Sequence, residues 1–349
     1  MDRVRRAIGA SMAGLLAGRA VAGEPGGGRV VLYTSTDPAA LRPLVKDFRE
    51  LHPQVRVEPH HLNSREIYHR FRREAAEGQP GADVVWSSAM DLQIKLVNDG
   101  HALAHPAAAA EGLPPWAVWK QEAFGTTFEP IGIAYSRRAI SDADVPRTRP
   151  ALVEWLQANA SRLRGRVATY DPEAAGIGWL LATEDAKVSR GFWDIARALG
   201  RCGVRLYTST SAMLEDLASG QVTLAYNILG SYARPVVRRD PSLGLVLPTD
   251  YTLVVSRVAF VSRHAPHLGP ARQWLSYLLS RRGQQVSADR AGLFALHREA
   301  QGEHTAGVLE RELGPALRPI AIGPGLMAHL DQGRRDDVLR RWRSALAAR

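Results

Sequence analysis

The chain has 349 residues, of which 45% are hydrophobic and 23% are charged. This length suits two domains, and this composition excludes a disordered, collagenous or coiled-coil description of the whole chain. The formal charge is +10, but the positive charges are scattered along the sequence, so no nucleic acid partner is predicted. The single cysteine, Cys202, excludes an intramolecular disulfide and a cysteine-rich metal or cluster site.

The N-terminus has the pattern of an export signal. A basic segment with three arginines (residues 3–6) precedes a short apolar stretch (residues 7–17), and residues 20–22 form a small-residue cleavage pattern. The apolar stretch is well short of the ~20 residues that a membrane span needs. We predict a signal peptide over residues 1–22, cleaved near Ala22, and therefore a periplasmic protein. A basic leader on a cytoplasmic protein is the alternative.

The segment that follows alternates short apolar runs with amphipathic stretches. The apolar runs predict strands at residues 29–33, 54–58 and 83–86. The stretches between and after them predict three helices, over residues 39–51, from Ser64 to Ala75, and through residues 92–97. Alternation of strands and helices indicates a parallel sheet with helices on its faces.

A second α/β region begins after a proline-marked loop at residues 145–150. Its predicted helices lie at residues 152–159, after 176, 191–199 and 212–219, and its strands at 166–170, 204–207, 222–227 and 243–247. Two β-like segments, residues 125–135 and 251–261, connect the two regions, and the tail is helical at 270–279 and 335–346. We expect an α/β protein with residues 29–130 plus 254–349 in lobe 1 and residues 135–250 in lobe 2.

Hydroxyl and amide side chains gather after the predicted strands, at residues 34–37, 87–88, 208–211 and 227–232. Ligands of open α/β sheets bind beyond the carboxyl ends of the strands. Most of these clusters also begin helices, whose first N–H groups and partial positive charge attract anions. Serine and threonine are equally the usual helix caps, so capping remains the alternative reading of each cluster.

Signals of catalysis are weak. The chain has no nucleophile elbow, no P-loop and no glycine-rich dinucleotide motif after a strand. Its histidines do not fall at metal-ligand spacing, and His60 and His61 are expected to face solvent. We therefore predict no enzyme activity, no catalytic residue, no metal ligand and no cofactor.

Four segments carry a family resemblance. They are Val-Val-Leu-Tyr-Thr-Ser at 30–35, Ala-Asp-Val-Val-Trp-Ser-Ser at 82–88, Gly-Gln-Val-Thr-Leu-Ala-Tyr-Asn at 220–227, and a late helix at 271–279 followed by Ser-Arg-Arg-Gly-Gln. Together they resemble the periplasmic solute-binding proteins of ABC importers, in the class that includes ferric-iron, thiamine, phosphoglycerate and hexose-phosphate binders. The resemblance covers residues 29–300. It implies a type II periplasmic binding fold, in which two Rossmann-like lobes joined by a two-strand hinge close on a ligand.

Departures from the resembled ferric-iron binders bear on the ligand. Those proteins carry a histidine after the first strand, a glutamate after the third and a tyrosine pair late in the second lobe. The matching positions here are Asp37, Ser88 and residues 229–230, and neutral serine and glycine do not supply the anionic oxygens that a trivalent cation needs. The segment 227–232 is closer to members that bind phosphorylated substrates. We predict a small anion, such as a sugar phosphate or phosphoglycerate.

Binding without catalysis is the predicted mechanism, with donors from both lobes favouring the closed state. The predicted ligand-binding residues are Ser35, Thr36, Ser88, Gly176, Ser209, Thr210, Asn227, Ser231, Tyr232, Asp250 and Arg257, the last two and Tyr232 being assigned to specificity. The expected partner is an ABC permease in the inner membrane. A ferric-iron transport protein, or a ligand sensor for a two-component kinase, is the alternative.

Overall fold

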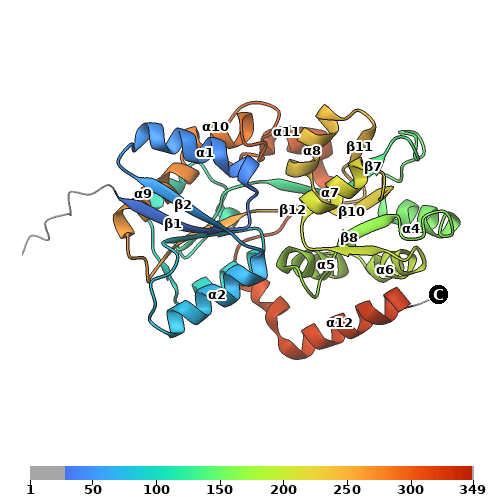
Figure 1. The fold of residues 1–349 in the computed structure, drawn as a ribbon, viewed down its shortest axis with the longest axis horizontal. Helices are drawn as coiled ribbons and strands as arrows, with labels where there is room; N and C mark the ends of the chain where they lie inside the picture. The colour runs from blue at the N-terminus through green and yellow to red at the C-terminus, as the bar shows by residue number, and fades with distance from the viewer. Residues whose placement is uncertain (1–27, 348–349) are drawn as a thin grey trace, which may run out of the picture.

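Two β-sheets, each flanked by helices, form the two lobes of the molecule (Figure 1). The computed structural model describes residues 28–347, so the predicted signal peptide lies outside the described residues. Across that range, no helix has both the length and the apolar character of a membrane span. The expected α/β architecture with two lobes is confirmed.

The sheet of lobe 1 has the strand order β2-β1-β3-β13-β6-β5, with β4 paired to β13. β1 runs parallel to β2 and β3, whereas β13 pairs antiparallel with β3 and β6. The strands are β1 (Arg29–Thr34), β2 (Arg56–His61), β3 (Val84–Ser87), β4 (Ala102–Leu103), β5 (Val118–Trp119), β6 (Ala123–Gly125) and β13 (Val258–Ser262).

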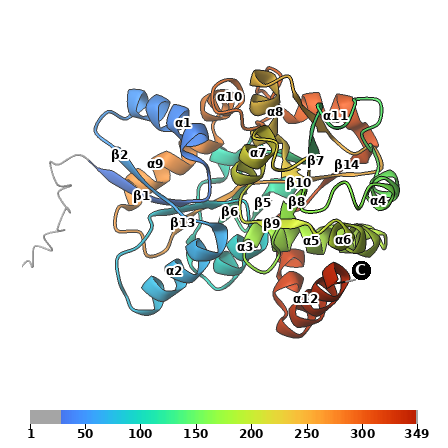
Figure 2. The ribbon, with the colours of Figure 1, turned by 45° about the vertical axis from the view of Figure 1, so that its right-hand side comes forward.

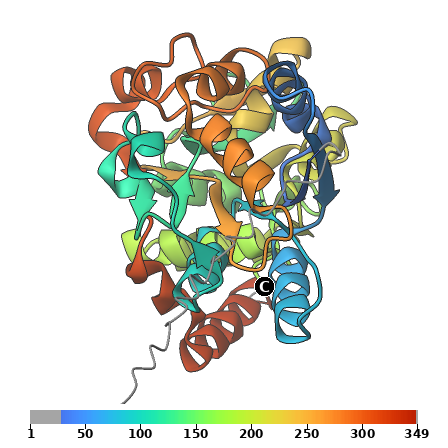
Figure 3. The same ribbon diagram turned by 90° about the vertical axis from the view of Figure 1, so that its left-hand side faces the viewer.

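Helices cover both faces of this sheet, which explains why β1, β3 and β13 are mostly apolar in the sequence. Val30 and Leu32 belong to the core that includes α1 (Pro38–Leu51) and α9 (Leu268–Leu279). Tyr33, one residue along β1, belongs instead to the core that includes α2 (Ser64–Ala76) and α3 (Met90–Asn98). Figure 3 shows α1 (dark blue) and α2 (light blue) on opposite sides of the lobe.

The cap of α2 differs from the prediction. Asn63, not Ser64, is the N-cap residue, and its side chain accepts hydrogen bonds from the N–H groups of Arg65 and Glu66. Glu66 returns a bond by accepting from the N–H of Asn63. The sequence Asn-Ser-Arg-Glu is therefore a capping box that begins one residue earlier than the serine suggested.

The sheet of lobe 2 has the order β14-β12-β7-β10-β8-β9, with β11 paired to β7. Its strands are β7 (Glu129–Ser136), β8 (Val167–Tyr170), β9 (Arg205–Tyr207), β10 (Leu224–Leu229), β11 (Leu243–Val246), β12 (Thr252–Val255) and β14 (Leu317–Pro319). The helices between them are α4 (Arg149–Ala158), α5 (Gly176–Val188), α6 (Phe192–Arg201), α7 (Thr210–Ala218) and α8 (Gly230–Arg239).

The C-terminal part of the chain departs from the expected division into lobes. We predicted residues 254–349 in lobe 1, but β14 pairs with β12 in the second sheet. α12 (Gln332–Ala347) packs against α6 (Figure 2). At this contact Trp342 stacks on Phe192 with ring centroids 6.1 Å apart. The apolar stripe of α12 is buried by lobe 2, and a sequence pattern does not say which lobe will bury it.

The remaining C-terminal elements are α10 (Arg281–Asp289), α11 (Ala306–Leu313) and the 3-10 helices η3 (Gly314–Ala316) and η4 (Pro324–Leu330). Two further 3-10 helices, η1 (Ala107–Ala110) and η2 (Pro115–Ala117), belong to the stretch between β4 and β5.

Each of the two predicted connecting strands is split where the chain passes between the sheets. Residues 126–128 separate β6 of lobe 1 from β7 of lobe 2, and residues 256–257 separate β12 of lobe 2 from β13 of lobe 1. The two crossings run side by side: the N–H of Thr126 donates to the carbonyl of Arg257 at 2.9 Å. These segments form the two-strand hinge.

A buried ion pair ties the two hinge segments together. The Arg257 guanidinium lies 2.7 Å from the Glu129 carboxylate, and both residues are fully buried. Thr127 adds two hydrogen bonds, donating to Glu129 at 2.8 Å and accepting from the N–H of Arg257 at 2.9 Å. Since an unpaired buried charge is costly, each partner of this pair depends on the other.

We expect Glu129→Gln to lower the free energy of unfolding by about 3–5 kcal/mol, because it leaves the Arg257 charge buried without its counter-ion. Urea denaturation measures this. Glu111→Gln, at an exposed carboxylate, is the matched control and should change stability by less than about 0.5 kcal/mol. Equal effects of the two substitutions would show that the hinge pair contributes nothing.

A second buried charge lies where lobe 1 meets the C-terminal segment. Asp91, in the first turn of α3, is fully buried, and neither carboxylate oxygen has a hydrogen-bond partner among the described residues. Burial raises its pKa to about 6, although His329 and Arg335 oppose the shift. η4 packs on α3 at this point, and the His329 ring lies 2.6 Å from the Glu184 carboxylate of lobe 2.

Asp91→Asn should stabilise the protein above pH 6 by about 1–3 kcal/mol. The carboxyl pKa is raised in the folded state, so the cost of burying its charge grows from about pH 4 and is complete above pH 6. The difference in melting temperature between variant and wild type should be larger at pH 7.5 than at pH 4.5. A difference independent of pH would contradict a buried charge at this position.

Candidate functional site

A cavity of about 280 Å³ lies between the lobes, at the carboxyl ends of strands from both sheets. Lobe 1 contributes the segments that follow β1, β2 and β3. Lobe 2 contributes the segments that follow β8, β9 and β10, and Arg257 enters from the hinge. We call this cavity the interlobe pocket.

Helix N-termini converge on the interlobe pocket. Among the described residues, its lining includes the first turn or the cap of α1, α2, α5, α7 and α8. The N-cap residues of three of them, Asp37, Ala175 and Leu229, make no side-chain cap hydrogen bond. The first-turn N–H groups of these helices therefore add positive potential to the pocket, as in anion-binding sites at helix N-termini.

The predicted hydroxyl groups already have partners in the protein, but several keep a hydrogen to donate. Thr36 accepts from Arg257 at 3.2 Å, and Ser209 accepts from the N–H of Ala212 at 3.2 Å. A hydroxyl that accepts one bond can still donate its own hydrogen. Ser209 therefore caps α7 and can also donate a hydrogen bond into the pocket. The capping interpretation and the ligand-binding interpretation of this residue are compatible.

Other hydroxyls bridge neighbouring strands or helices. Ser35 donates to Ser87 at 3.2 Å and accepts from the N–H of Ser88 at 3.3 Å, which joins the ends of β1 and β3. Thr210 is bonded to the phenol of Tyr170 at 2.5 Å. These bonds orient the polar groups at the ends of the strands and hold them in the pocket wall.

The charge of Arg257 is balanced within the protein. Its guanidinium pairs with Glu129 and lies over the ring of Tyr232, 5.0 Å from the ring centroid. Burial raises the pKa of Tyr232 to about 12, so its phenol stays protonated near neutral pH. The arrangement offers neutral donors, helix termini and one compensated guanidinium.

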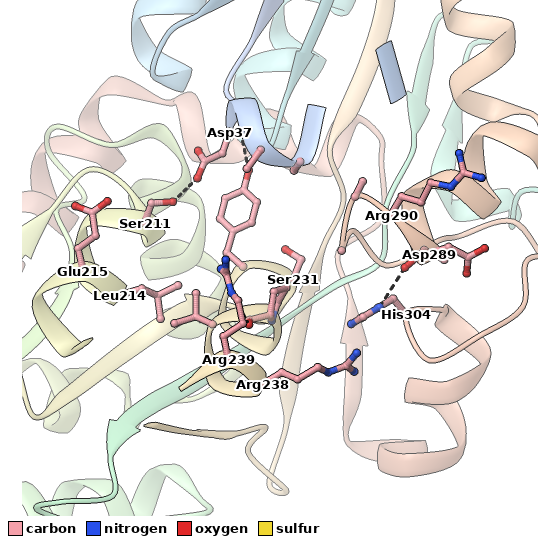
Figure 4. A pocket seen from close by; sticks show the side chains of 18 of the residues that line it. Asp37, Ser211, Leu214, Glu215, Ser231, Arg238, Arg239, Asp289, Arg290 and His304 are labelled. Carbon is pink, nitrogen blue, oxygen red and sulfur yellow. Dashed lines mark hydrogen bonds between the residues drawn. The ribbon is translucent and has the colours of Figure 1, made fainter. Parts of the chain in front are cut away.

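The two lobes touch across the pocket. The N–H of Asp37, at the start of α1, donates to the Tyr232 hydroxyl at 2.9 Å, and Ser211 of α7 donates to the Asp37 carboxylate. Figure 4 shows Asp37 and Ser211 facing each other. Gly176 lies against lobe 1 so closely that an added Cβ would be 3.0 Å from the Ala89 Cβ. This is a closed arrangement of the lobes.

Eight of the eleven predicted ligand-binding residues line the interlobe pocket: Ser35, Thr36, Ser88, Gly176, Ser209, Thr210, Tyr232 and Arg257. The other three do not. Ser231 turns to the hinge and donates to Glu129. Asn227 is buried in lobe 2, whereas Asp250 lies at the surface of that lobe.

A buried network around Asp185 accounts for Asn227 and Asp250. The fully buried Asp185 accepts hydrogen bonds from Asn227 at 2.8 Å and Tyr226 at 2.8 Å, and it pairs with Arg149 at 3.2 Å. Asp250 pairs with the same guanidinium at 3.3 Å. Their position after strands suggested a ligand role, but the side chains satisfy a buried charge instead.

Asn227 also adopts a backbone conformation that few residues tolerate. Its φ is +60°, within a shift of register between β10 and β7, and asparagine tolerates this left-handed conformation better than most residues.

Sequence reasoning missed the segment after β2, because that strand runs to His61, three residues beyond the predicted end. His61, Asn63, Ser64 and Glu66 line the pocket, and the His61 Nδ1 lies 3.0 Å from the carbonyl of Thr36. His61 is exposed, as expected, yet it also borders the pocket. The rule about strand ends would have found this segment had the end of β2 been placed correctly.

Within residues 28–347, no three His, Cys, Asp or Glu side chains gather in a way that could hold a metal ion. Asp37, His61 and Glu66 all line the pocket, but each has a partner in the protein.

Asn227→Ala should lower stability by about 2–4 kcal/mol, because it removes a hydrogen bond to a buried carboxylate and strains a positive φ. Asn227→Gly loses only the bond and should cost less. Both variants should keep the ligand affinity of the wild type within a factor of two, measured by calorimetry alongside urea denaturation. If a variant lost ligand binding while its stability was unchanged, Asn227 would be a ligand contact.

Comparison with known proteins agrees with this architecture. Residues 30–290 match the family of bacterial extracellular solute-binding proteins. The chain is 37% identical to the substrate-binding protein of an ABC transporter from Agrobacterium tumefaciens, with a TM-score of 0.88 over 93% of this chain and 96% of that one. No curated protein gave a significant match to the sequence.

Two further solved structures share the fold at low identity. AfuA from Actinobacillus pleuropneumoniae, with fructose 6-phosphate bound, has a TM-score of 0.76 at 16% identity, over 91% of this chain and 98% of that one. Iron-bound HitA from Pseudomonas aeruginosa has a TM-score of 0.68 at 19% identity, over 91% and 99%. The predicted type II periplasmic binding fold is confirmed, and the chain belongs to the bacterial extracellular solute-binding proteins, the substrate-binding components of ABC transporters.

Proposed function

We propose that this protein binds a small anion, an organophosphate, in the interlobe pocket and presents it to an ABC permease in the inner membrane. The proposal includes export to the periplasm with cleavage near Ala22. The single observation that supports an anionic ligand is the convergence of helix N-termini on a pocket lined by hydroxyl groups.

Binding would draw on both lobes. Ser35, Thr36 and Ser88 lie on one wall, and Ser209 and Thr210 on the other. A ligand that accepts hydrogen bonds from both walls does so in the closed state alone, so it stabilises that state over the open one. The closed shape is then the form that a permease recognises.

Ferric iron is the competing ligand, and the phenols argue against it. Iron coordination by tyrosine uses the deprotonated phenolate, and burial raises the pKa of Tyr232 to about 12, which adds to the free-energy cost of removing that proton. Burial also raises the pKa of Tyr170, the other phenol of the pocket, well above its usual value. Protonated phenols are hydrogen-bond donors, and donors suit an anion.

Ser209 offers a substitution that separates the two ligands. Ser209→Asp keeps a good N-cap for α7 but adds a negative charge to the pocket wall. We expect the added charge to repel the ligand and to lower the affinity for fructose 6-phosphate or 3-phosphoglycerate at least tenfold. This corresponds to a change of about 1.4 kcal/mol in the free energy of binding. Isothermal titration calorimetry measures this, and thermal unfolding checks that the fold is intact.

Ser209→Asn is the matched control, because asparagine caps as well as aspartate without the charge. Its affinity for the two phosphate compounds should stay within threefold of the wild-type affinity. Ferric citrate is titrated in parallel. Tight iron binding that Ser209→Asp leaves unchanged, with no response to any phosphate compound, would reverse the assignment.

A further inference from the structure

A second cavity, of about 660 Å³, adjoins the interlobe pocket and is also formed by both lobes. Lobe 1 contributes α1 and the end of α10 with the loop that follows it. Lobe 2 contributes α7 and α8. Figure 4 shows residues from both lobes around this space, with Leu214 and Arg239 on one side and His304 on the other. We call it the outer compartment.

The two cavities share a border. Asp37 and Tyr232 line both of them. The hydrogen bonds that make this border, from the Asp37 N–H to Tyr232 and from Ser211 to the Asp37 carboxylate, run between the lobes. They separate when the lobes open, so the border is a contact of the closed state and not a wall built within one lobe.

The inner surface of the outer compartment is mostly apolar. Its walls include Ala39 of α1, Leu214 and Ala218 of α7, and Val236 of α8. Three arginines, Arg238, Arg239 and Arg290, also line the cavity, alongside the carboxylates of Asp37, Glu215 and Asp289. Two of the arginines have acidic partners nearby, since Arg238 pairs with Glu303 and the Arg290 guanidinium lies 3.9 Å from the Asp47 carboxylate.

Size and chemistry divide the two cavities into different roles. Ligand sites commonly have volumes of about 300–1,000 Å³. The interlobe pocket falls just below that range, and the hydroxyl groups and helix N-termini that line it suit the anionic group. The outer compartment falls within the range, and most of its surface is apolar, although polar side chains such as Ser211, Glu215 and His304 also line it. A mostly apolar surface suits an apolar group more than a polyhydroxylated sugar.

We propose that the ligand is an organic phosphate with an apolar, aromatic or alkyl substituent, which lies in the outer compartment while the phosphate lies in the interlobe pocket. This inference rests on the proposed function and narrows its substrate class. The ligand replaces the contacts between Asp37, Tyr232 and Ser211 as it crosses the border.

The test compares three probes by calorimetry: inorganic phosphate, phenyl phosphate and fructose 6-phosphate. Wild-type protein should bind phenyl phosphate at least tenfold more tightly than inorganic phosphate, and more tightly than fructose 6-phosphate. Ala291→Phe, in the loop after α10 of lobe 1, and Ala218→Phe, in α7 of lobe 2, fill the outer compartment from the two lobes. Each should reduce the advantage of phenyl phosphate to less than threefold and leave inorganic phosphate unchanged.

Ala76→Phe is the matched control, since Ala76 is an exposed helical alanine of lobe 1 outside both cavities. It should leave all three affinities unchanged. Two blocking variants are used so that the test remains decisive if one of them does not fold. Equal affinity for phenyl and inorganic phosphate, or an advantage that survives both blocking variants, overturns the inference and leaves the proposed function standing. If no phosphate compound binds the wild-type protein, the proposed function falls and this inference falls with it.

Discussion

The buried pair between Arg257 and Glu129 lies where the chain passes between its two sheets. Both crossings must run side by side for the carboxyl ends of the two sheets to face each other, and this pair joins them. The same guanidinium reaches Thr36 at 3.2 Å and the ring of Tyr232, one from each lobe. One charged side chain therefore contacts both the hinge and the pocket.

Because Glu129 balances Arg257, the pocket does not rely on an uncompensated cation. Its positive potential comes from the first turns of helices that belong to both lobes. Peptide dipoles are fixed by the backbone and need no side-chain ordering when a ligand arrives. Such a site can hold an anion and release it unchanged, which is what a transport component requires.

Closure is built from few contacts. Tyr232 receives the N–H at the start of α1, and Gly176 permits the close approach of α5 to lobe 1. The C-terminal segment adds a third connection, since η4 packs on α3 and its His329 meets Glu184 of α5. Asp91, buried at this junction without a hydrogen-bond partner among the described residues, makes the connection sensitive to charge.

The order of strands and helices, the two-lobed α/β class and eight residues of the pocket could be predicted from the sequence, because apolar periodicity and residues after strand ends are local signals. What a local signal does not carry is the direction of a side chain after a strand. Asn227 lies within β10 and Asp250 lies between β11 and β12, and their side chains bind Asp185 and Arg149 of lobe 2. The apolar stripe of α12 likewise does not indicate which lobe buries it. Those choices depend on partners that are distant along the chain, 42 residues for Asn227 and Asp185 and 101 residues for Asp250 and Arg149, so tertiary structure decided them.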